Sequence, residues 1–161
     1  MAVATFVVIA GCDRICPKAL PVAAPVPGVA AAPIPPTDSR VTYELRERCG
    51  RESRDWFKHF YGDGASKTKD YEGTSGYTNH YNIAQGRCLA LITTVGFSRS
   101  AKTDKVNMSD ARDLVDVSEN KTIGEYYRFR DNAQPMQCSL AGADCTSQNG
   151  WESLAAPYME R

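Results

Sequence analysis

Cysteine is the residue type with the widest chemical capacity in this chain of 161 residues, which contains six cysteines. Two stand near the beginning, and the complete set is Cys12, Cys16, Cys49, Cys88, Cys138 and Cys145. A cysteine thiolate binds a metal, attacks a substrate or forms a disulfide, and spacing and redox environment decide between these roles. So many cysteines in a chain of this size favour metal binding, catalysis or an oxidising compartment.

Residues 40–161 contain four of the cysteines, for which three disulfide pairings are possible. Cys138 and Cys145 enclose a short segment with a glycine, which suits a local disulfide. That pairing leaves Cys49 and Cys88, whose bond would join a predicted helix to a predicted strand. Zinc is the alternative, but this part of the chain has no Cys-x-x-Cys pair. We therefore predict two disulfides and no metal site.

The chain contains only two histidines, and His80 is the more suggestive of them. It lies in a predicted strand between Tyr77 and Tyr81. Because imidazole titrates near neutral pH, His80 is a candidate for ligand binding or acid–base chemistry, and Tyr77 and Tyr81 are candidate ligand-binding residues beside it. The alternative is a strand histidine that is hydrogen-bonded to a neighbour. The sequence has no Gly-x-Ser-x-Gly elbow, phosphate-binding loop or His-Glu-x-x-His motif, so we predict no catalytic residue and no cofactor.

Charge and aromatic content narrow the class of partner. Lysine and arginine together number 19, as do aspartate and glutamate, so no basic excess points to nucleic acid. Tyrosines concentrate around the predicted strands, where they form either a recognition surface or cross-strand packing. They are Tyr71, Tyr77, Tyr81, Tyr126 and Tyr127.

Two helices are predicted to position these residues. Residues 42–61 carry a stripe at helical spacing that is flanked by Phe57 and Tyr61 and is expected to face the core: Leu45, Cys49, Ser53, Trp56 and Phe60. A second helix is predicted near the end of the chain, where Ser147 is a plausible N-cap. Its apolar stripe consists of Trp151, Leu154, Ala155 and Tyr158.

Strands are predicted between the helices. Residues 76–98 resemble a hairpin in pattern, with β-prone runs on both sides of residues 83–86. Residues 114–130 predict a second hairpin that turns at residues 119–121, and a short strand is expected at residues 136–140. The predicted fold is therefore α+β. An antiparallel meander of four to five strands carries an N-terminal and a C-terminal helix on one face, and disulfides cross-link the domain.

The segment before residue 40 has the composition of an export signal followed by a tether. Residues 2–10 are apolar and would span about 14 Å as a helix, which is too short to cross a bilayer and typical of a signal peptide. Residues 17–36 contain seven of the nine prolines. This composition predicts an extended, polyproline-like tether with a reach of about 60 Å. The alternative for the apolar run is a buried strand with a structural cysteine.

The sequence Ile9-Ala10-Gly11-Cys12 resembles the lipobox of bacterial lipoprotein signals. The resemblance implies that residues 1–11 are removed and that the Cys12 thiol is joined to diacylglycerol. In such lipoproteins the next residue takes part in sorting, and Asp13 favours retention in the inner membrane. Cys16 is a second lipid site, an intermolecular disulfide or an idle thiol. The implied location is the bacterial cell envelope, with the chain anchored to a bilayer and facing the periplasm or the outside.

A second resemblance concerns YTNHYNIAQGRC, residues 77–88. It is similar to a His-Tyr-Asn strand followed by a cysteine in uncharacterised exported bacterial proteins, which implies an envelope protein and no particular activity. The expected organisation is a signal peptide (1–11), an acylated cysteine with its Pro/Ala-rich tether (12–39) and a globular domain (40–161). Two functions are open: a non-enzymatic module that binds an envelope protein or glycan, and a small envelope hydrolase that uses His80.

Overall fold

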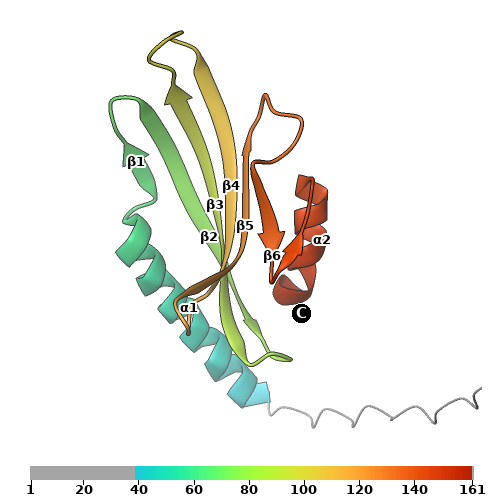
Figure 1. Ribbon diagram of the computed structural model, residues 1–161. Helices are drawn as coiled ribbons and strands as arrows, with labels where there is room; N and C mark the ends of the chain where they lie inside the picture. Colours follow the sequence, from blue (N-terminus) through green and yellow to red (C-terminus); the bar gives the residue numbers. More distant parts are fainter. Residues whose placement is uncertain (1–38, 161) are drawn as a thin grey trace, which may run out of the picture. The chain divides into compact units, whose positions relative to one another are not determined.

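A meander of seven strands between two helices makes up the part of the chain that the computed structural model describes, residues 39–160 (Figure 1). Each strand pairs antiparallel with the next, in sequence order. The elements are α1 (Ser39–Tyr61), β1 (Ala65–Lys67), β2 (Tyr71–Asn82), β3 (Arg87–Arg99), β4 (Val106–Asp116), β5 (Lys121–Phe129), β6 (Gln137–Leu140), β7 (Ala143–Asp144) and α2 (Gln148–Met159). The described residues belong to one compact unit.

Helix α1 combines a charged outer face with a narrow buried stripe. Oppositely charged side chains four residues apart pair along the outer face, and each such pair stabilises a helix by about 0.2 to 0.5 kcal/mol. The pairs are Arg40–Glu44, Glu47–Arg51 and Arg48–Glu52. The residue that follows the helix is Gly62, which has a φ of 63° and donates its N–H to the carbonyl of Lys58. Glycine adopts this left-handed conformation without strain, so it stops the helix at low cost.

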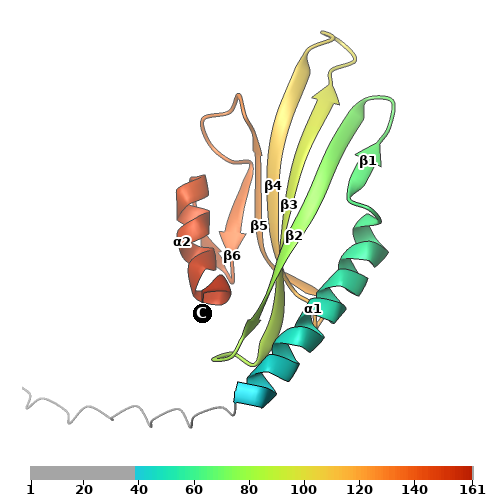
Figure 2. The same ribbon diagram turned by 180° about the vertical axis from the view of Figure 1, so that it is seen from behind.

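The two helices cover opposite faces of the sheet (Figures 1 and 2). On one face, Ala90 and Val115 pack against Phe57 of α1. On the other, Leu89 and Leu114 pack in a cluster with Trp151 of α2. Because neighbouring residues of a strand point to opposite faces, these adjacent pairs place one helix on each side.

The α+β class, the order of helix, meander and helix, and the two disulfides are confirmed. Two details of the prediction are corrected for residues 39–160: the sheet has seven strands where four to five were expected, and the helices lie on opposite faces where one shared face was expected. The physical reason is visible in β3. Leu89, Ala90 and Ile92 are all buried, so this central strand needs cover on both sides.

The buried stripe of α1 also differs from the prediction. Its buried residues are Cys49, Ser53 and Phe57, whereas Phe60 is 53 % exposed. The bond from Cys49 to the sheet fixes how α1 is rotated about its axis. Phe57 then packs against Tyr77 of β2, with ring centroids 4.7 Å apart. Phe60 is therefore directed away from the core.

Both predicted disulfides are present. Cys49 bonds to Cys88 and joins α1 to β3, and Cys138 bonds to Cys145 near the start of α2. The four sulfurs are thus taken up in pairs, which excludes the zinc alternative for them. No helix in residues 39–160 combines the length and the apolar character that crossing a bilayer requires. The signal peptide, the acylation of Cys12, the role of Cys16 and the tether concern residues outside those that the structure describes.

Candidate ligand-binding groove

A hollow of about 540 Å³ lies between α1 and the turn that joins β4 to β5, and we call it the α1 groove. Helix α1 contributes both aromatic and charged side chains to it, and the turn contributes polar ones. The lining residues are Arg48, Glu52, Asp55, Trp56, His59 and Phe60 from α1, and Val117, Ser118 and Asn120 from the turn. This volume falls within the range of small-ligand sites, which is about 300 to 1,000 Å³.

Two aromatic rings form the apolar part of the α1 groove. Trp56 and Phe60 are four residues apart on α1, so they lie one above the other on the same face. Their ring centroids are 4.7 Å apart and their planes are inclined by 42°. Trp56 is half-buried, whereas Phe60 is largely exposed. An exposed aromatic pair on a rigid helix is a contact surface that loses little side-chain entropy on binding.

A hydrogen bond across the α1 groove holds the indole of Trp56. Its Nε1–H donates to Oδ1 of Asn120 at 2.6 Å. Asn120 has a φ of 48°, a left-handed conformation that asparagine tolerates better than most residues. Because Oδ1 accepts from the indole, the two N–H bonds of the Asn120 amide point elsewhere and are available as donors.

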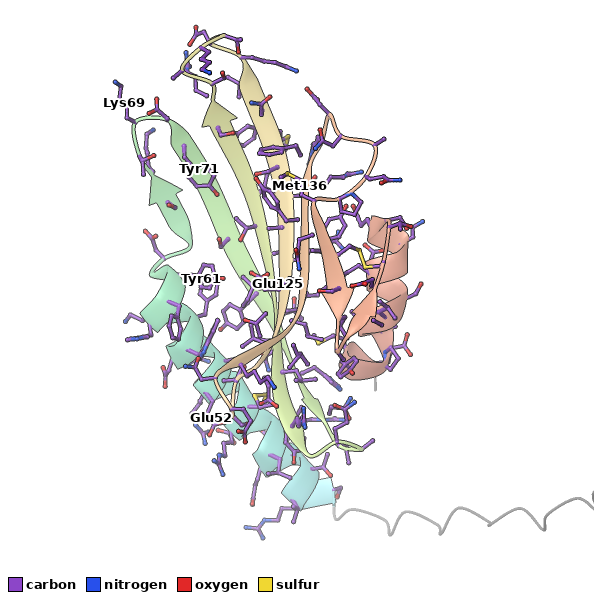
Figure 3. All side chains as sticks on the ribbon, viewed as in Figure 1. Glu52, Tyr61, Lys69, Tyr71, Glu125 and Met136 are labelled. Carbon is purple, nitrogen blue, oxygen red and sulfur yellow. A yellow bond between two sulfur atoms is a disulfide. The ribbon has the colours of Figure 1, made fainter. Side chains whose placement is uncertain are left out.

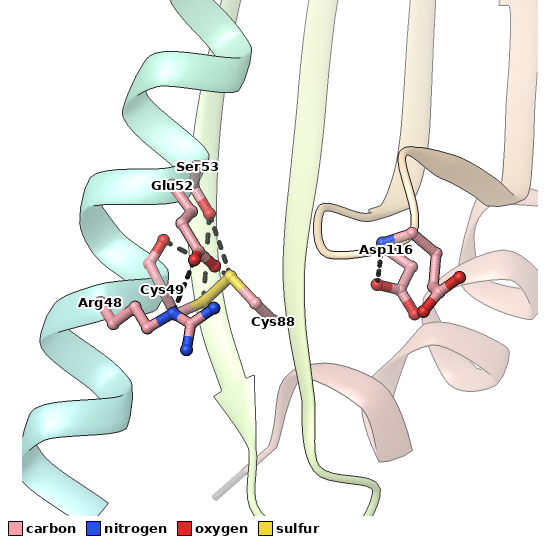
Figure 4. Close-up of a disulfide and its surroundings, with 7 residues drawn as sticks. Arg48, Cys49, Glu52, Ser53, Cys88 and Asp116 are labelled. Atoms are coloured by element: carbon pink, nitrogen blue, oxygen red, sulfur yellow. Dashed lines mark hydrogen bonds and ion pairs between the residues drawn. A yellow bond between two sulfur atoms is a disulfide. The ribbon is translucent and has the colours of Figure 1, made fainter.

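A single residue of β3, Cys88, anchors both walls of the α1 groove, and Figure 4 shows its disulfide with Cys49 on the helix side. Cys88 is bonded to Cys49 of α1, and its carbonyl oxygen accepts the N–H of Val117 at 2.9 Å. The Ser53 hydroxyl lies 3.5 Å from the sulfur of Cys88 and donates to it, since a disulfide sulfur carries no hydrogen. Cys49, Ser53 and Cys88 are all buried. Helix and turn are therefore fixed to the same point of the sheet.

The β4–β5 turn is further ordered by the buried carboxylate of Asp116. Its Oδ1 accepts the N–H of Glu119 at 3.2 Å, and its Oδ2 lies 3.5 Å from Nη1 of Arg87. The N–H of Asn120 donates to the carbonyl of Val117 at 3.3 Å. The main chain of this wall is thus hydrogen-bonded within itself.

Charges of both signs surround the aromatic pair. Nε of Arg48 lies 2.7 Å from Oε1 of Glu52 across one helical turn. This hydrogen bond, together with the charge of Glu52, raises the pKa of Arg48 above its ordinary value. Asp55 adds a second carboxylate, and His59 packs edge-on against Phe60 with ring centroids 4.7 Å apart. The α1 groove therefore offers hydrogen-bond acceptors and donors beside an apolar surface.

Of the three residues of the predicted His80 site, the structure brings two together and separates Tyr77 from them. His80 and Tyr81 line a smaller hollow of about 320 Å³ together with Arg46 and Asn79. Tyr77 lies outside it and packs against Phe57. The described residues that line this hollow include no carboxylate. A role of His80 and Tyr81 in ligand binding stays a prediction.

A second polar cluster lies where the end of α1 meets the sheet (Figure 3). The Tyr61 hydroxyl donates to Asp113 of β4, and Asp113 stands directly opposite Glu125 of β5. Burial, followed by the charge of Glu125, raises the pKa of Asp113 above its ordinary value. Burial, followed by the charge of Asp113, raises the pKa of Tyr61. Within residues 39–160, acidic, histidine and cysteine side chains form no group of three suited to a metal ion.

The groove was not predicted from the sequence as a site, although its residues carry a signal. Trp56 and Phe60 stand four residues apart in the sequence. This spacing fits an exposed aromatic pair on a helix, but it fits a buried stripe equally well. The predicted turn at residues 119–121 includes Asn120, a residue common in left-handed positions. What connects these features is contact between residues 64 positions apart, as in the Trp56–Asn120 hydrogen bond.

Of the predicted tyrosine cluster, two members serve as packing. Tyr126 is buried against α2, where its ring centroid lies 6.4 Å from that of Trp151. Tyr77 packs against Phe57 of α1.

Comparison with protein-family models, curated proteins and solved structures gives no match to this chain. The sequence and the geometry of the described residues are therefore the basis for the function of this chain.

Proposed function

We propose that this chain is a membrane-anchored lipoprotein of the bacterial cell envelope, and that its disulfide-stapled domain is a non-enzymatic module that binds another envelope component in the α1 groove. The observation that carries the binding role is the exposed Phe60 beside the hydrogen-bonded Trp56, both in a hollow with rigid walls. A side chain as apolar as phenylalanine that is 53 % exposed beside a second ring marks a candidate contact surface.

The envelope location is supported by three features of the chain. The lipobox-like sequence ends an apolar run, and a proline-rich segment follows it. The two disulfides suit an oxidising compartment, because thiols of cytosolic proteins are kept reduced. Two acyl chains on Cys12 would anchor the mature chain stably, since each buried methylene contributes about 0.8 kcal/mol.

The anchoring part of the proposal is tested by intact-mass analysis of the chain extracted from bacterial membranes. We expect a mature chain that begins at Cys12 and carries the mass of the lipid. The matched control is Cys12→Ser, which we expect to leave the membrane fraction and to lack the lipid mass. A chain that keeps residues 1–11, or that is bound to membranes equally well with Cys12→Ser, would overturn the lipid anchor.

The binding part is tested by photo-crosslinking in intact cells. A photo-crosslinking amino acid in place of Ser118 faces the α1 groove, and the same amino acid in place of Thr78 lies on β2, outside it. We expect a crosslinked envelope component, protein or glycan, from position 118 only, and we expect Phe60→Ala to reduce its yield. Equal crosslinking from both positions would argue against a site at the α1 groove.

A further inference from the structure

We infer that the α1 groove binds a neutral saccharide, with sugar rings stacked on Trp56 and Phe60. This inference rests on the proposed binding function and names the ligand class. A sugar ring presents C–H groups on its faces and hydroxyls around its edge. It therefore needs an aromatic face for the first and a mixed set of hydrogen-bond donors and acceptors for the second.

The α1 groove supplies both requirements. The rings of Trp56 and Phe60 pack against each other, with centroids 4.7 Å apart and planes inclined by 42°, so they form one continuous apolar surface. Asp55 and Oε2 of Glu52, whose Oε1 is held by Arg48, accept hydrogen bonds, and the amide of Asn120 donates them. Sugar hydroxyls both donate and accept hydrogen bonds, so they can pair with the donors and acceptors around the α1 groove.

The charges in the α1 groove argue against an anionic ligand. Arg48 is already paired with Glu52 at 2.7 Å, and Asp55 adds a further negative charge. A phosphate, sulfate or uronate group would meet this carboxylate without an unpaired arginine to balance it. A neutral sugar meets no such repulsion.

The backbone of the α1 groove argues against an extended peptide. One wall is a helix, and in the other wall the N–H groups of Glu119 and Asn120 are bonded to Asp116 and Val117. Neither wall offers a strand edge for a peptide main chain. The indole N–H of Trp56, which in aromatic grooves can donate to the carbonyl of a proline-rich segment, is taken by Asn120. These contacts leave another recognition mode open, in which a sugar ring stacks on the aromatic side chains and its hydroxyls form hydrogen bonds with the polar side chains.

Rigidity of the walls supports a site that is formed before the ligand arrives. Cys88 holds α1 through Cys49 and holds the turn through Val117. The groove volume of about 540 Å³ accommodates a ligand of a few rings. Little ordering of the protein is then required on binding.

The inference is tested with the full chain carrying Cys12→Ser and four neutral trisaccharides as probes: cellotriose, chitotriose, maltotriose and mannotriose. The readout is the change in tryptophan fluorescence on adding the sugar, which is assigned to Trp56 because the other tryptophan, Trp151, is only 1 % exposed and packs in the α2 cluster. We expect saturable binding of at least one trisaccharide. Phe60→Ala should weaken it about 3- to 10-fold, the effect of losing one aromatic stacking partner. Phe60 is exposed, so this variant should keep the fold, which a thermal melt verifies.

Two controls sharpen the result. Tyr43→Ala removes an aromatic ring that is 67 % exposed on the same helix but outside the α1 groove, and it should leave the affinity unchanged. Trigalacturonate and a peptide with the sequence of residues 17–36 serve as anionic and proline-rich probes, and both should bind more weakly than the best neutral trisaccharide.

The saccharide inference is overturned if none of the neutral probes approaches saturation at about 10 mM, or if Phe60→Ala binds them as well as the parent chain does. It is also overturned if the anionic or proline-rich probe binds best. Crosslinking of an envelope protein from position 118 that depends on Phe60 would, in any of these cases, leave the binding module intact and only its ligand class wrong. If both the titrations and the crosslinking are negative, the binding function falls with the saccharide.

Discussion

The carbonyl oxygen of Cys88 accepts the N–H of Val117 at 2.9 Å, while the sulfur of the same cysteine is bonded to Cys49. One residue of β3 therefore holds the helix on one side of the α1 groove and the turn on the other. The disulfide closes a separation of 39 residues and also sets the width of the groove. Stability and binding are coupled through this residue.

We expect the Cys49→Ala/Cys88→Ala double variant to lower the free energy of unfolding by about 4 kcal/mol, because a closure of this length restricts the unfolded chain strongly. The matched control is Cys138→Ala/Cys145→Ala. Its separation of only 7 residues predicts a loss of about 2 kcal/mol. Urea denaturation of oxidised protein measures both. If the Cys138/Cys145 variant loses more than the other, packing around the sulfurs outweighs the closure of the chain.

Phe57 and Phe60 form a second matched pair, because they are the same residue type three positions apart on α1. We expect Phe57→Ala to cost about 3 to 5 kcal/mol, since Phe57 is only 8 % exposed and packs in the core. Phe60→Ala should cost less than about 1 kcal/mol, as is usual for an exposed side chain. Thermal and urea melts decide the matter. Equal losses for both variants would mean that Phe60 is buried by another part of the chain.

This pair also shows how far the sequence predicts the structure. Helical periodicity correctly placed a helix over residues 42–61, but it allowed either aromatic residue to face the core. The rotation of α1 is decided by the bond from Cys49 to β3, a contact distant in sequence. The pairing itself was predictable, because Cys138 and Cys145 are close in the chain. The error over Phe60 arose because an aromatic residue at helical spacing is usually buried, and here it lines a groove.

The sheet shows the same limit. The apolar run of β3 and the turn at residues 119–121 predicted a meander with a central strand. The pattern did not separate the residues that face α1 from those that face α2, since Leu89 and Ala90 are both fully buried. The α1 groove depends on the Trp56–Asn120 contact between two such elements. No local pattern specifies a contact of this kind.

Asn120 is expected to act through both its conformation and its side chain. Asn120→Ala should lower the free energy of unfolding by about 1 to 2 kcal/mol, because alanine is strained at a φ of 48°. Asn120→Gly relieves that strain, yet it also removes the acceptor of the Trp56 indole. We therefore expect near-parent stability for the glycine variant but the same change in tryptophan fluorescence in both. An unchanged emission spectrum in the glycine variant would show that the hydrogen bond does not orient Trp56.

The carboxylates of Asp113 and Glu125, which lie opposite each other on β4 and β5, predict a pH dependence of stability. Burial and the charge of Glu125 raise the pKa of Asp113 in the folded chain, although the hydrogen bond from Tyr61 opposes this shift. The folded chain therefore keeps this proton at a higher pH than the unfolded chain, in which the pKa is about 3.9. The contribution of Asp113 is fully present below that value and is lost as the pH rises through the folded pKa.

Glu125→Gln removes the like charge opposite Asp113 and should lower its pKa towards the ordinary value. We expect the variant to gain about 0.2 to 1 kcal/mol at pH 7, the usual size of a cross-strand pair effect, and to lose less stability between pH 4 and pH 7 than the parent chain does. Urea denaturation across this range measures the difference. Glu119→Gln, at an exposed position of the β4–β5 turn, is the control and should follow the parent curve. Parallel curves for the parent and Glu125→Gln would show that Asp113 and Glu125 do not interact.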